Sequence, residues 1–196
     1  MTVFCRTFNF VSAAAGLLIL TPILVMIAIA IKWDDGGPIF YLQQRIGRNF
    51  QPFRLIKFRS MTVGADQSGL LTASADQRVT RCGRWLRQSK LDELPQLWNV
   101  LTGDMQLVGP RPEVERYVEQ FREQYSALLT DPPGITDPAS LVFRREHQLF
   151  VPAEMERQYV SEVLPRKLIL SLEYHGRRGF ASDLGILLKT ILGFSS

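Results

Sequence analysis

The chain has 196 residues, with 23 Lys and Arg against 19 Asp and Glu, which gives a formal net charge of +4. This length suits one domain with its own core plus an appendage. The mild positive charge is compatible with anionic lipid, phosphorylated substrates or nucleic acid and does not choose among them. The two cysteines, Cys5 and Cys82, have no C-x-x-C spacing. Composition therefore argues against a disulfide scaffold or a zinc site and favours a reducing, cytosol-facing environment.

Residues 10–31 form an almost uninterrupted apolar segment. As a straight helix this segment would be about 33 Å long, close to the ~30 Å hydrocarbon core of a bilayer. Two features argue against a simple span. Thr21-Pro22 lies at its centre, where proline kinks or breaks a helix, and Arg6 and Lys32 place a positive charge at both ends. A re-entrant helix broken at Pro22, with the Thr21 hydroxyl binding a released carbonyl, meets both conditions; a spanning helix and a signal peptide remain alternatives.

A turn cluster at residues 34–38 separates this segment from the remainder, which predicts a membrane anchor at 1–33 and a cytosolic domain at 34–196. Short strands are predicted at 39–43 and 53–61, joined as a hairpin. The period of two places Lys57 and Arg59 on one face, about 7 Å apart, where they could bind two oxygens of a diphosphate. A solvated edge strand protected by its charges is the alternative.

The loop predicted at 62–77 leads into residues 78–88, which carry an arginine every three residues in a pattern close to a helical stripe. Such a stripe is commonly a solvated helix face. Here Arg84 and Arg87 lead directly to the adjacent carboxylates Asp92 and Glu93. Carboxylates beside cations are typical of phosphate or metal chemistry.

Apolar spacing predicts a helix over residues 89–102 and leaves two interpretations of the acidic pair. In the first, Ser89 and Asp92 form a capping box, and the carboxylate only satisfies the first turn. In the second, the helix begins near Leu94 with Pro95 at its first position, which proline favours. Asp92 and Glu93 then precede a helix N-terminus, which stabilises negative charge and attracts phosphate, and either arrangement predicts that both are charged at neutral pH.

Downstream, two prolines in residues 109–112 stiffen the backbone around Arg111. Helices are predicted at 113–129, 160–174 and 182–194, with Arg177 and Arg178 between the last two. The last two helices are amphipathic and could pack in the core or lie on a membrane surface. The expected fold class is α+β, mostly helical with a small β-hairpin, an N-terminal re-entrant membrane helix and interfacial helices. Phosphate-loop, dinucleotide-binding and zincin motifs are missing from the sequence, as are an obvious aromatic RNA-binding signature and a recognisable zinc finger.

Taken together, the motifs resemble the bacterial sugar transferases, monotopic polyprenyl-phosphate phosphoglycosyl transferases, in what looks like their minimal catalytic form. The resemblance covers nearly the whole chain. It rests on eight segments in order, at residues 37–41, 44–47, 57–61, 76–80, 91–97, 103–105, 109–112 and 133–136.

This resemblance implies an enzyme that transfers a sugar-1-phosphate from a UDP-sugar to undecaprenyl phosphate, releases UMP and starts a lipid-linked glycan such as an O-antigen, a capsule, an exopolysaccharide or a glycoprotein glycan. By analogy, Asp92 is the nucleophile that forms an aspartyl phospho-sugar, and Glu93 with Asp92 holds Mg²⁺. Lys57, Arg59, Arg87, Arg111 and Pro112 would bind the donor and the lipid phosphate.

The resemblance also implies a location at the cytoplasmic face of the bacterial inner membrane and favours the re-entrant anchor. Expected partners are a UDP-sugar, undecaprenyl phosphate, membrane lipid and downstream glycosyltransferases; nucleic acid is not expected. A second hypothesis is a non-enzymatic adaptor on the membrane surface that binds anionic lipid or a partner enzyme through its basic helices.

Three departures from the family pattern limit the inference. Thr21 stands before Pro22 where serine is common, and Phe50 stands where glycine is common. After the Pro-Gly-Ile-Thr motif the chain continues with residues 137–140 as Asp-Pro-Ala-Ser instead of the usual Gly and Ala-Gln. Because that region is expected to shape sugar choice, the sequence does not assign a sugar.

Overall fold

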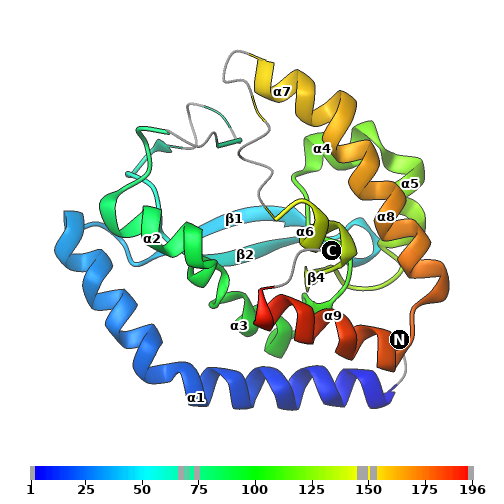
Figure 1. The fold of residues 1–196 in the computed structure, drawn as a ribbon, viewed down its shortest axis with the longest axis horizontal. Helices are drawn as coiled ribbons and strands as arrows, with labels where there is room; N and C mark the ends of the chain where they lie inside the picture. The colour runs from blue at the N-terminus through cyan, green and yellow to red at the C-terminus, as the bar shows by residue number, and fades with distance from the viewer. Residues whose placement is uncertain are drawn as a thin grey trace.

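The structure is a computed structural model and describes residues 3–65, 69, 71–72, 76–144, 150 and 154–193. As expected, it is mostly helical, with a small antiparallel hairpin (Figure 1). Its α-helices are α1 (Val3–Asp35), α2 (Arg81–Ser89), α3 (Gln96–Thr102), α4 (Glu115–Gln120), α5 (Arg122–Leu128), α6 (Pro138–Val142), α7 (Met155–Gln158), α8 (Leu164–Arg177) and α9 (Phe180–Leu192).

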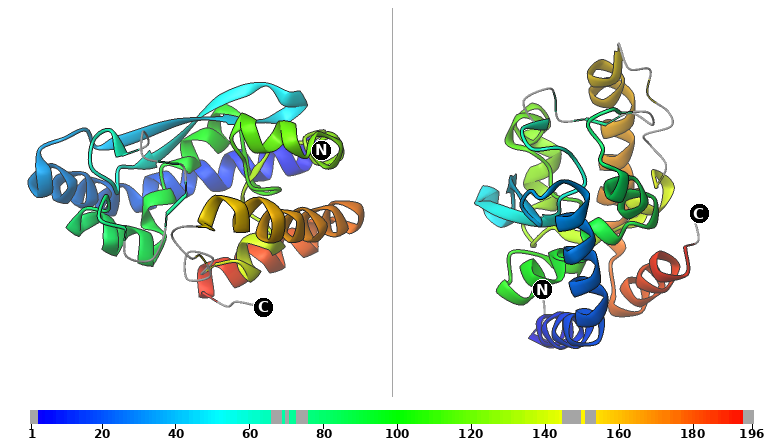
Figure 2. Two further views of the ribbon diagram at one scale, coloured as in Figure 1. Left: turned by 90° about the horizontal axis from the view of Figure 1, so that it is seen from above. Right: turned by 90° about the vertical axis from the view of Figure 1, so that its left-hand side faces the viewer.

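The hairpin consists of β1 (Phe40–Ile46) and β2 (Pro52–Phe58), with Phe40 opposite Phe58. The predicted first strand was therefore too short by three residues at its C-terminal end, and the second too long by the same number. Beyond Phe58 the Arg59 amide still donates a 2.9 Å hydrogen bond to the Ile39 carbonyl, but Met61 pairs with Val79 instead of with the first strand. Both views in Figure 2 place the hairpin on one side of the molecule and helices α8 and α9 on the opposite side.

The N-terminal helix α1 is long and apolar enough to cross a membrane by length and composition, and only 11% of its most apolar window is buried. Pro22 lies inside it, and the Thr21 hydroxyl donates a hydrogen bond of 2.7 Å to the carbonyl of Leu17. Figure 1 shows that α1 bends, with its N-terminal part along the lower edge and its C-terminal part rising beside α2. The helix continues through Pro22 and ends at Asp35.

Both halves of α1 are attached to the rest of the protein. In the first half, Asn9 accepts a 2.7 Å hydrogen bond from the backbone amide of Leu107, and Ala13 is fully buried. In the second half, Ile27 and Ile31 are buried in a cluster that includes Phe58 and Leu86. Helix α1 therefore lies along one side of the remaining chain instead of projecting from it.

Several helices differ from the sequence-based expectations. The predicted helix 113–129 is two helices, α4 and α5, because Phe121 between them has φ −120° and ψ 37°. The predicted helix 160–174 is α8, which begins at Leu164 and follows a π-helical turn at Tyr159–Val163. The last helix, α9, runs from Phe180 to Leu192; residue 194, which the prediction included, lies outside the described residues.

A short parallel pair, β3 (Gln106–Val108) and β4 (Gly134–Thr136), joins two proline-containing segments and was not predicted. The pairing needs two glycines because the backbones nearly touch. A Cβ added to Gly134 would lie 2.1 Å from the amide nitrogen of Gly109. This pair positions the residues that follow Gly109.

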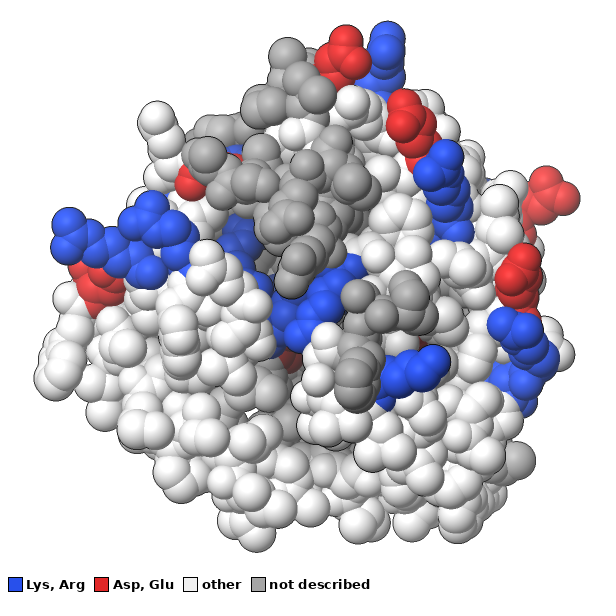
Figure 3. Space-filling model, in the orientation of Figure 1, with Lys and Arg blue, Asp and Glu red and all other residues white. Residues whose placement is uncertain are grey.

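One face of the molecule is apolar. In Figure 3 the lower part, over α1 and α9 of Figure 1, is almost entirely uncharged, whereas charged side chains gather over the upper part. The exposed large apolar side chains of the two helices are Val3, Phe4, Phe10, Val11, Leu18, Ile19, Ile23, Val25, Met26, Ile29 and Trp33 of α1 and Phe180, Leu184, Leu188, Ile191 and Leu192 of α9. So large an exposed apolar surface is typical of a membrane or protein contact.

The sequence interpretation placed Arg178 on a basic flank, but the structure places it inside. Its guanidinium binds Asp183, the side chain of Gln106 and the carbonyl of Val108. Arg177, next to it, is exposed. Arg178 therefore connects the start of α9 to β3 and is not an external basic group.

Candidate active site

The acidic pair lies in a break between two helices. Helix α2 ends at Ser89, and Lys90 adopts a left-handed conformation with φ 59° before a 3₁₀ turn at Leu91–Glu93. Helix α3 begins at Gln96, with Pro95 as its N-cap. The proline-based interpretation is therefore close to the structure, and a continuous helix over 89–102 is wrong.

The capping-box interpretation is also wrong. The Ser89 hydroxyl donates to the carbonyls of Trp85 and Leu86, at 2.8 and 3.2 Å, and so closes the end of α2 instead of capping a new helix. Trp98, which the apolar spacing assigned to the buried face, is 56% exposed. The carboxylates are thus not explained by helix capping.

Glu93 is held by two cations. Arg111 binds both of its carboxylate oxygens, with Nη1 3.2 Å from Oε2 and Nη2 on Oε1, and Lys57 Nζ lies 3.5 Å from Oε1. Burial alone would raise the pKa of Glu93, but the attraction of Arg111 and Lys57 outweighs it and holds the pKa well below its usual range. Glu93 is therefore a permanent anion, as expected.

Asp92 has the opposite environment. Its residue is only 8% exposed, and its Oδ1 has no hydrogen-bond partner among the described residues. Burial, followed by repulsion from Glu93, raises the pKa of Asp92 despite attraction from Lys57 and Arg87. The helix terminus alone predicted the same charged state for both carboxylates. In the structure Glu93 is bound by cations, whereas Asp92 is buried and poorly solvated.

Arg87 is the member of the arginine stripe that faces the acidic pair. Its Nη2 donates to the Thr72 hydroxyl at 2.9 Å, and burial lowers its pKa while Asp92 attracts it. Arg81 and Arg84, on the same helix, are exposed. Arg81 and Arg84 of the stripe are thus solvated, and Arg87 belongs to the site.

Arg78 is not on the helix with the other arginines. Helix α2 begins after the Thr80 cap, and the Arg78 guanidinium instead binds the side chain of Asp76 and the carbonyls of Ala65, Gly69 and Leu71. The predicted loop at 62–77 lies partly outside the described residues. Within the described part, Arg78 organises this connection.

Arg59 lies apart from the acidic pair. It follows the end of β2, and its guanidinium binds both oxygens of Asp35 as well as the carbonyls of Pro38 and Met61. The structure therefore does not bring together Lys57 and Arg59, which the strand period placed on one face. Gly37 permits this contact, since a Cβ there would lie 2.8 Å from Arg59 Nη2.

The segment that presents Arg111 is fixed on both sides. The Pro110 carbonyl accepts a 2.9 Å hydrogen bond from the Gly134 amide, and the Pro112 carbonyl accepts one of 3.2 Å from Arg45 Nη1. Pro112 is buried and Arg111 is half-buried. Arg45 was not identified as a site residue from the sequence, which placed it in the connection after the first predicted strand and gives no signal of so distant a partner.

The residues that could hold a metal are few. Among the described residues there is no group of three or more His, Cys, Asp or Glu side chains suited to a metal ion. Mg²⁺ commonly uses only one or two carboxylates and completes its shell with water and substrate phosphates. Asp92, with its unpartnered oxygen, and Glu93 fit that donor set, provided that Arg111 and Lys57 release Glu93.

The site combines a poorly solvated carboxylate, a paired carboxylate and three cations in a domain whose long apolar helix is largely exposed. Such a combination is suited to phosphorylated molecules at a lipid surface. The sequence profile of the family described as "Bacterial sugar transferase" matches residues 1–195. The chain therefore belongs to the bacterial sugar transferase family.

Curated relatives agree with this assignment. The chain is 37% identical over 196 residues to an undecaprenyl-phosphate glucose phosphotransferase of Komagataeibacter xylinus, an alignment that covers 95% of this chain and 35% of the relative. It is 39% identical over 141 residues to a UDP-N-acetylgalactosamine-undecaprenyl-phosphate N-acetylgalactosaminephosphotransferase of Aeromonas hydrophila, with 70% and 33% coverage. It is 33% identical over 171 residues to the exopolysaccharide production protein ExoY of Rhizobium meliloti, with 79% and 76% coverage. The chain thus spans about a third of the length of the first two relatives.

Proposed function

We propose that this protein is a phosphoglycosyl transferase that moves a sugar-1-phosphate from a UDP-sugar to undecaprenyl phosphate, releases UMP and begins a lipid-linked glycan. Support comes from the family and from relatives whose names include these substrates. The observation that carries the mechanism is the buried Asp92 oxygen without a partner, beside a cation-bound Glu93. A carboxylate with a raised pKa and little solvation is well suited to act as a nucleophile.

The proposed reaction has two displacements. In the first, an Asp92 carboxylate oxygen attacks the sugar-linked phosphorus of the UDP-sugar, and the bond from this phosphorus to the bridging oxygen breaks. UMP leaves with that oxygen and its electron pair. In the second, a phosphate oxygen of undecaprenyl phosphate attacks the same phosphorus, the bond to Asp92 breaks, and the carboxylate is regenerated.

The cations of the site offset the repulsion between anions. Lys57, Arg87 and Arg111 surround the acidic pair and would bind the diphosphate of the donor and the lipid phosphate, while the buried Pro112 would form part of the donor site. Bound through Asp92 and Glu93, Mg²⁺ would supply further positive charge to the phosphate oxygens. Arg59 has no place in this proposal because Asp35 and two carbonyls occupy its guanidinium.

We further propose that α1 is a re-entrant anchor at the cytoplasmic face of the inner membrane. The support is that Asn9, near one end of α1, binds Leu107, while Asp34, near the other end, binds the Cys82 amide at 2.9 Å. A straight span would carry one end of the helix across the bilayer, away from the domain. Single cysteines at Val3 and Trp33, with Cys5 and Cys82 replaced by serine, test this topology. A membrane-impermeant maleimide should label both only from the cytoplasmic side, and labelling from opposite sides would contradict it.

The activity is tested with membranes that contain the protein, undecaprenyl phosphate and a panel of UDP-sugars, and UMP release is the readout. We expect release with at least one donor, dependent on a divalent cation and lost in Asp92→Asn. Asp104→Asn is the control because Asp104 is an exposed aspartate whose side chain accepts a hydrogen bond from the Thr102 hydroxyl near the end of α3. If no donor releases UMP, the proposed function is wrong. If the adaptor hypothesis holds, Asp92→Asn and Glu93→Gln will leave the biological function intact, whereas reversal of the charge at the exposed Arg177 will remove it.

A further inference from the structure

Glu113 is a buried carboxylate directly after the segment that presents Arg111. It is 7% exposed, its Oε2 lies 2.9 Å from Arg45 Nη1, and its Oε1 accepts a hydrogen bond from the Tyr159 hydroxyl. Its backbone carbonyl accepts a 3.0 Å hydrogen bond from the Ile46 amide. Burial would raise the pKa of Glu113, but attraction from Arg45 and other nearby cations outweighs burial and lowers it. Glu113 is therefore an ionised group with partners from two separate parts of the fold.

These partners connect the hairpin to the helical side of the molecule. Arg45 and Ile46 belong to β1, whereas Tyr159 is the first residue of the π-helical turn that precedes α8. A π-helical turn shifts the side chains that follow it by one position, and such turns are frequent at functional sites. Here the turn contains a tyrosine whose hydroxyl reaches Glu113. Two sides of the protein are thus tied at one carboxylate.

The consequence for Arg111 follows from its neighbours. Arg45 binds Glu113 and the Pro112 carbonyl with the same nitrogen, and its other guanidinium nitrogens bind the side chain of Gln43. The Pro110 carbonyl is independently bound by Gly134. The backbone of Arg111 therefore lies between two fixed carbonyls, one of which depends on Arg45 and hence on Glu113. From this backbone position its half-buried side chain reaches both oxygens of Glu93.

We infer that Glu113, together with Arg45 and Tyr159, is a positioning group that holds Arg111 in the active site. Their effect on Arg111 passes through the Pro112 carbonyl, which Arg45 binds, and through the attraction between the Glu113 carboxylate and the Arg111 guanidinium. The expected effect on kcat/KM rests on the proposed function, whereas the expected effect on the backbone around Arg111 does not. In the wild type, Arg111 is oriented before substrate binds, which reduces the entropic cost of holding it in the transition state.

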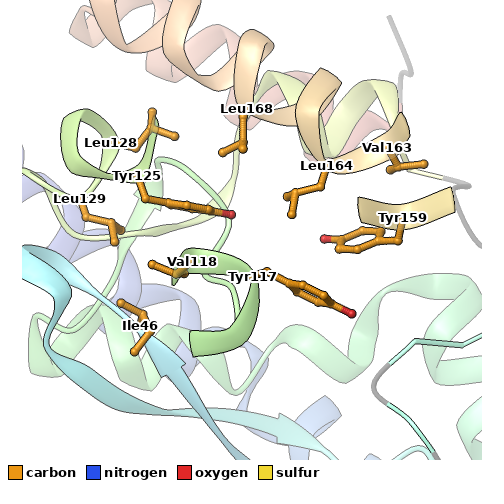
Figure 4. Packing of buried hydrophobic residues seen from close by; sticks show 10 residues of the cluster. All are labelled: Ile46, Tyr117, Val118, Tyr125, Leu128, Leu129, Tyr159, Val163, Leu164 and Leu168. Atoms are coloured by element: carbon orange, nitrogen blue, oxygen red, sulfur yellow. The ribbon is translucent and has the colours of Figure 1, made fainter. Parts of the chain in front are cut away.

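The structure provides a matched control for Tyr159. Tyr117 and Tyr159 are 1% and 2% exposed, their ring centroids are 5.1 Å apart, and each donates its hydroxyl to a glutamate. Figure 4 shows that their hydroxyls point in different directions from the shared apolar cluster. Tyr117 binds Glu156, whose side chain is 42% exposed and pairs with Arg116 of α4 at 3.1 Å instead of with Arg45 or the Pro112 carbonyl. Tyr117→Phe and Tyr159→Phe thus remove equivalent groups with different connections.

The experiment measures kcat/KM for the UDP-sugar and amide hydrogen exchange over residues 109–116 in the full-length protein. We expect Tyr159→Phe to lower kcat/KM about 5- to 10-fold and to speed exchange in this segment, while Tyr117→Phe changes kcat/KM less than 2-fold. In an Arg111→Ala background, Tyr159→Phe should have no further effect on kcat/KM, because its effect acts through Arg111. A merely structural role would give additive losses in that background.

Equal kcat/KM in the two single variants, or additive losses with Arg111→Ala, would overturn the inference. If Tyr159→Phe does not fold, Arg45→Lys is the second variant, since lysine cannot bind Glu113, Gln43 and the Pro112 carbonyl together. If the wild type releases no UMP from any donor, the proposed function fails, and the exchange measurement alone decides the positioning role. In that case unchanged exchange over 109–116 in Tyr159→Phe would contradict it.

Discussion

Two arginine–carboxylate pairs in this protein have the same local geometry but different surroundings. Arg111 binds both oxygens of Glu93, and Arg59 binds both oxygens of Asp35. The Arg59 side chain is 5% exposed and also binds two backbone carbonyls, whereas the Arg111 side chain is 32% exposed. Arg59 is enclosed by the protein, and Arg111 borders solvent.

The difference separates a structural contact from a candidate catalytic one. The Arg59–Asp35 pair joins the end of α1 to the end of β2, and the arginine is surrounded by acceptors. The Arg111–Glu93 pair lies beside Asp92, whose buried Oδ1 has no hydrogen-bond partner in the described part of the chain. Buried polar groups are normally satisfied, so an unpartnered carboxylate oxygen next to cations indicates a function, whereas an arginine enclosed by acceptors away from the acidic pair indicates a role in stability.

The largest expected effect is that of Asp92→Asn. We expect kcat to fall on the order of 10³-fold or more, because the amide cannot form the covalent intermediate. Because the folded-state pKa of Asp92 is raised, its ionised form is less stable in the folded protein than in the unfolded chain at neutral pH. The variant should therefore unfold at an equal or higher denaturant concentration than the wild type. Full activity, or clear destabilisation, would mean that Asp92 is structural.

Arg59→Met should show the reverse pattern. Removing a buried guanidinium leaves Asp35 and two carbonyls without their partner, and we expect a loss of about 3 kcal/mol in the free energy of unfolding, measured by urea denaturation. The activity of the folded fraction should stay within about twofold of the wild type. Arg84→Met is the control, since Arg84 is exposed. A large loss of activity at full stability would place Arg59 in the site after all.

The comparison also shows what the sequence alone could predict. Pro95 and the acidic pair correctly indicated carboxylates before a helix start, because proline preference and helix-terminus electrostatics are local effects. The partner of Arg59 was not predictable in this way. Asp35 is 24 residues away, and the strand period describes directions only while the strand lasts, whereas β2 ends at Phe58.

A smaller effect concerns pH. Arg87 attracts Asp92 and so limits the rise in the Asp92 pKa. In Arg87→Gln that attraction is lost, the pKa of Asp92 rises further, and the acidic limb of the kcat/KM profile should move to higher pH. Arg84→Gln, on the same helix, should leave the limb in place. An unchanged limb in Arg87→Gln would show that Asp92 ionisation does not control the reaction.

The smallest effect is the pH dependence of the Arg59–Asp35 contact. The hydrogen bond from Arg59 lowers the pKa of Asp35 to about 2, although burial, the next largest effect, acts to raise it. Because this value is below that of an unfolded aspartate, about 3.9, the contribution to stability is complete above pH ~5 and is lost as pH falls toward 2. The stability difference between wild type and Asp35→Asn should shrink by about 1 kcal/mol between pH 5 and 2, after allowance for solvent exposure. Urea denaturation at each pH measures it, and a constant difference would contradict it.

Other features depend on contacts that sequence patterns do not encode. The parallel pairing of β3 with β4 brings together segments that each look like an isolated proline turn, and the close approach at Gly109 and Gly134 is visible only when both are present. The left-handed Lys90, which interrupts the predicted helix, belongs to a residue type that rarely adopts this conformation. The fold class follows from local periodicity, but the assembly of the site depends on tertiary packing.

The central claim, that Asp92 is the nucleophile, is tested most directly by mass spectrometry of the protein after brief incubation with a UDP-sugar in the absence of undecaprenyl phosphate. We predict a peptide containing Asp92 that is heavier by one sugar phosphate, lost when undecaprenyl phosphate is added and never formed by Asp92→Asn. An enzyme that releases UMP only when both substrates are present, with no modified peptide on any carboxylate, would contradict the covalent mechanism.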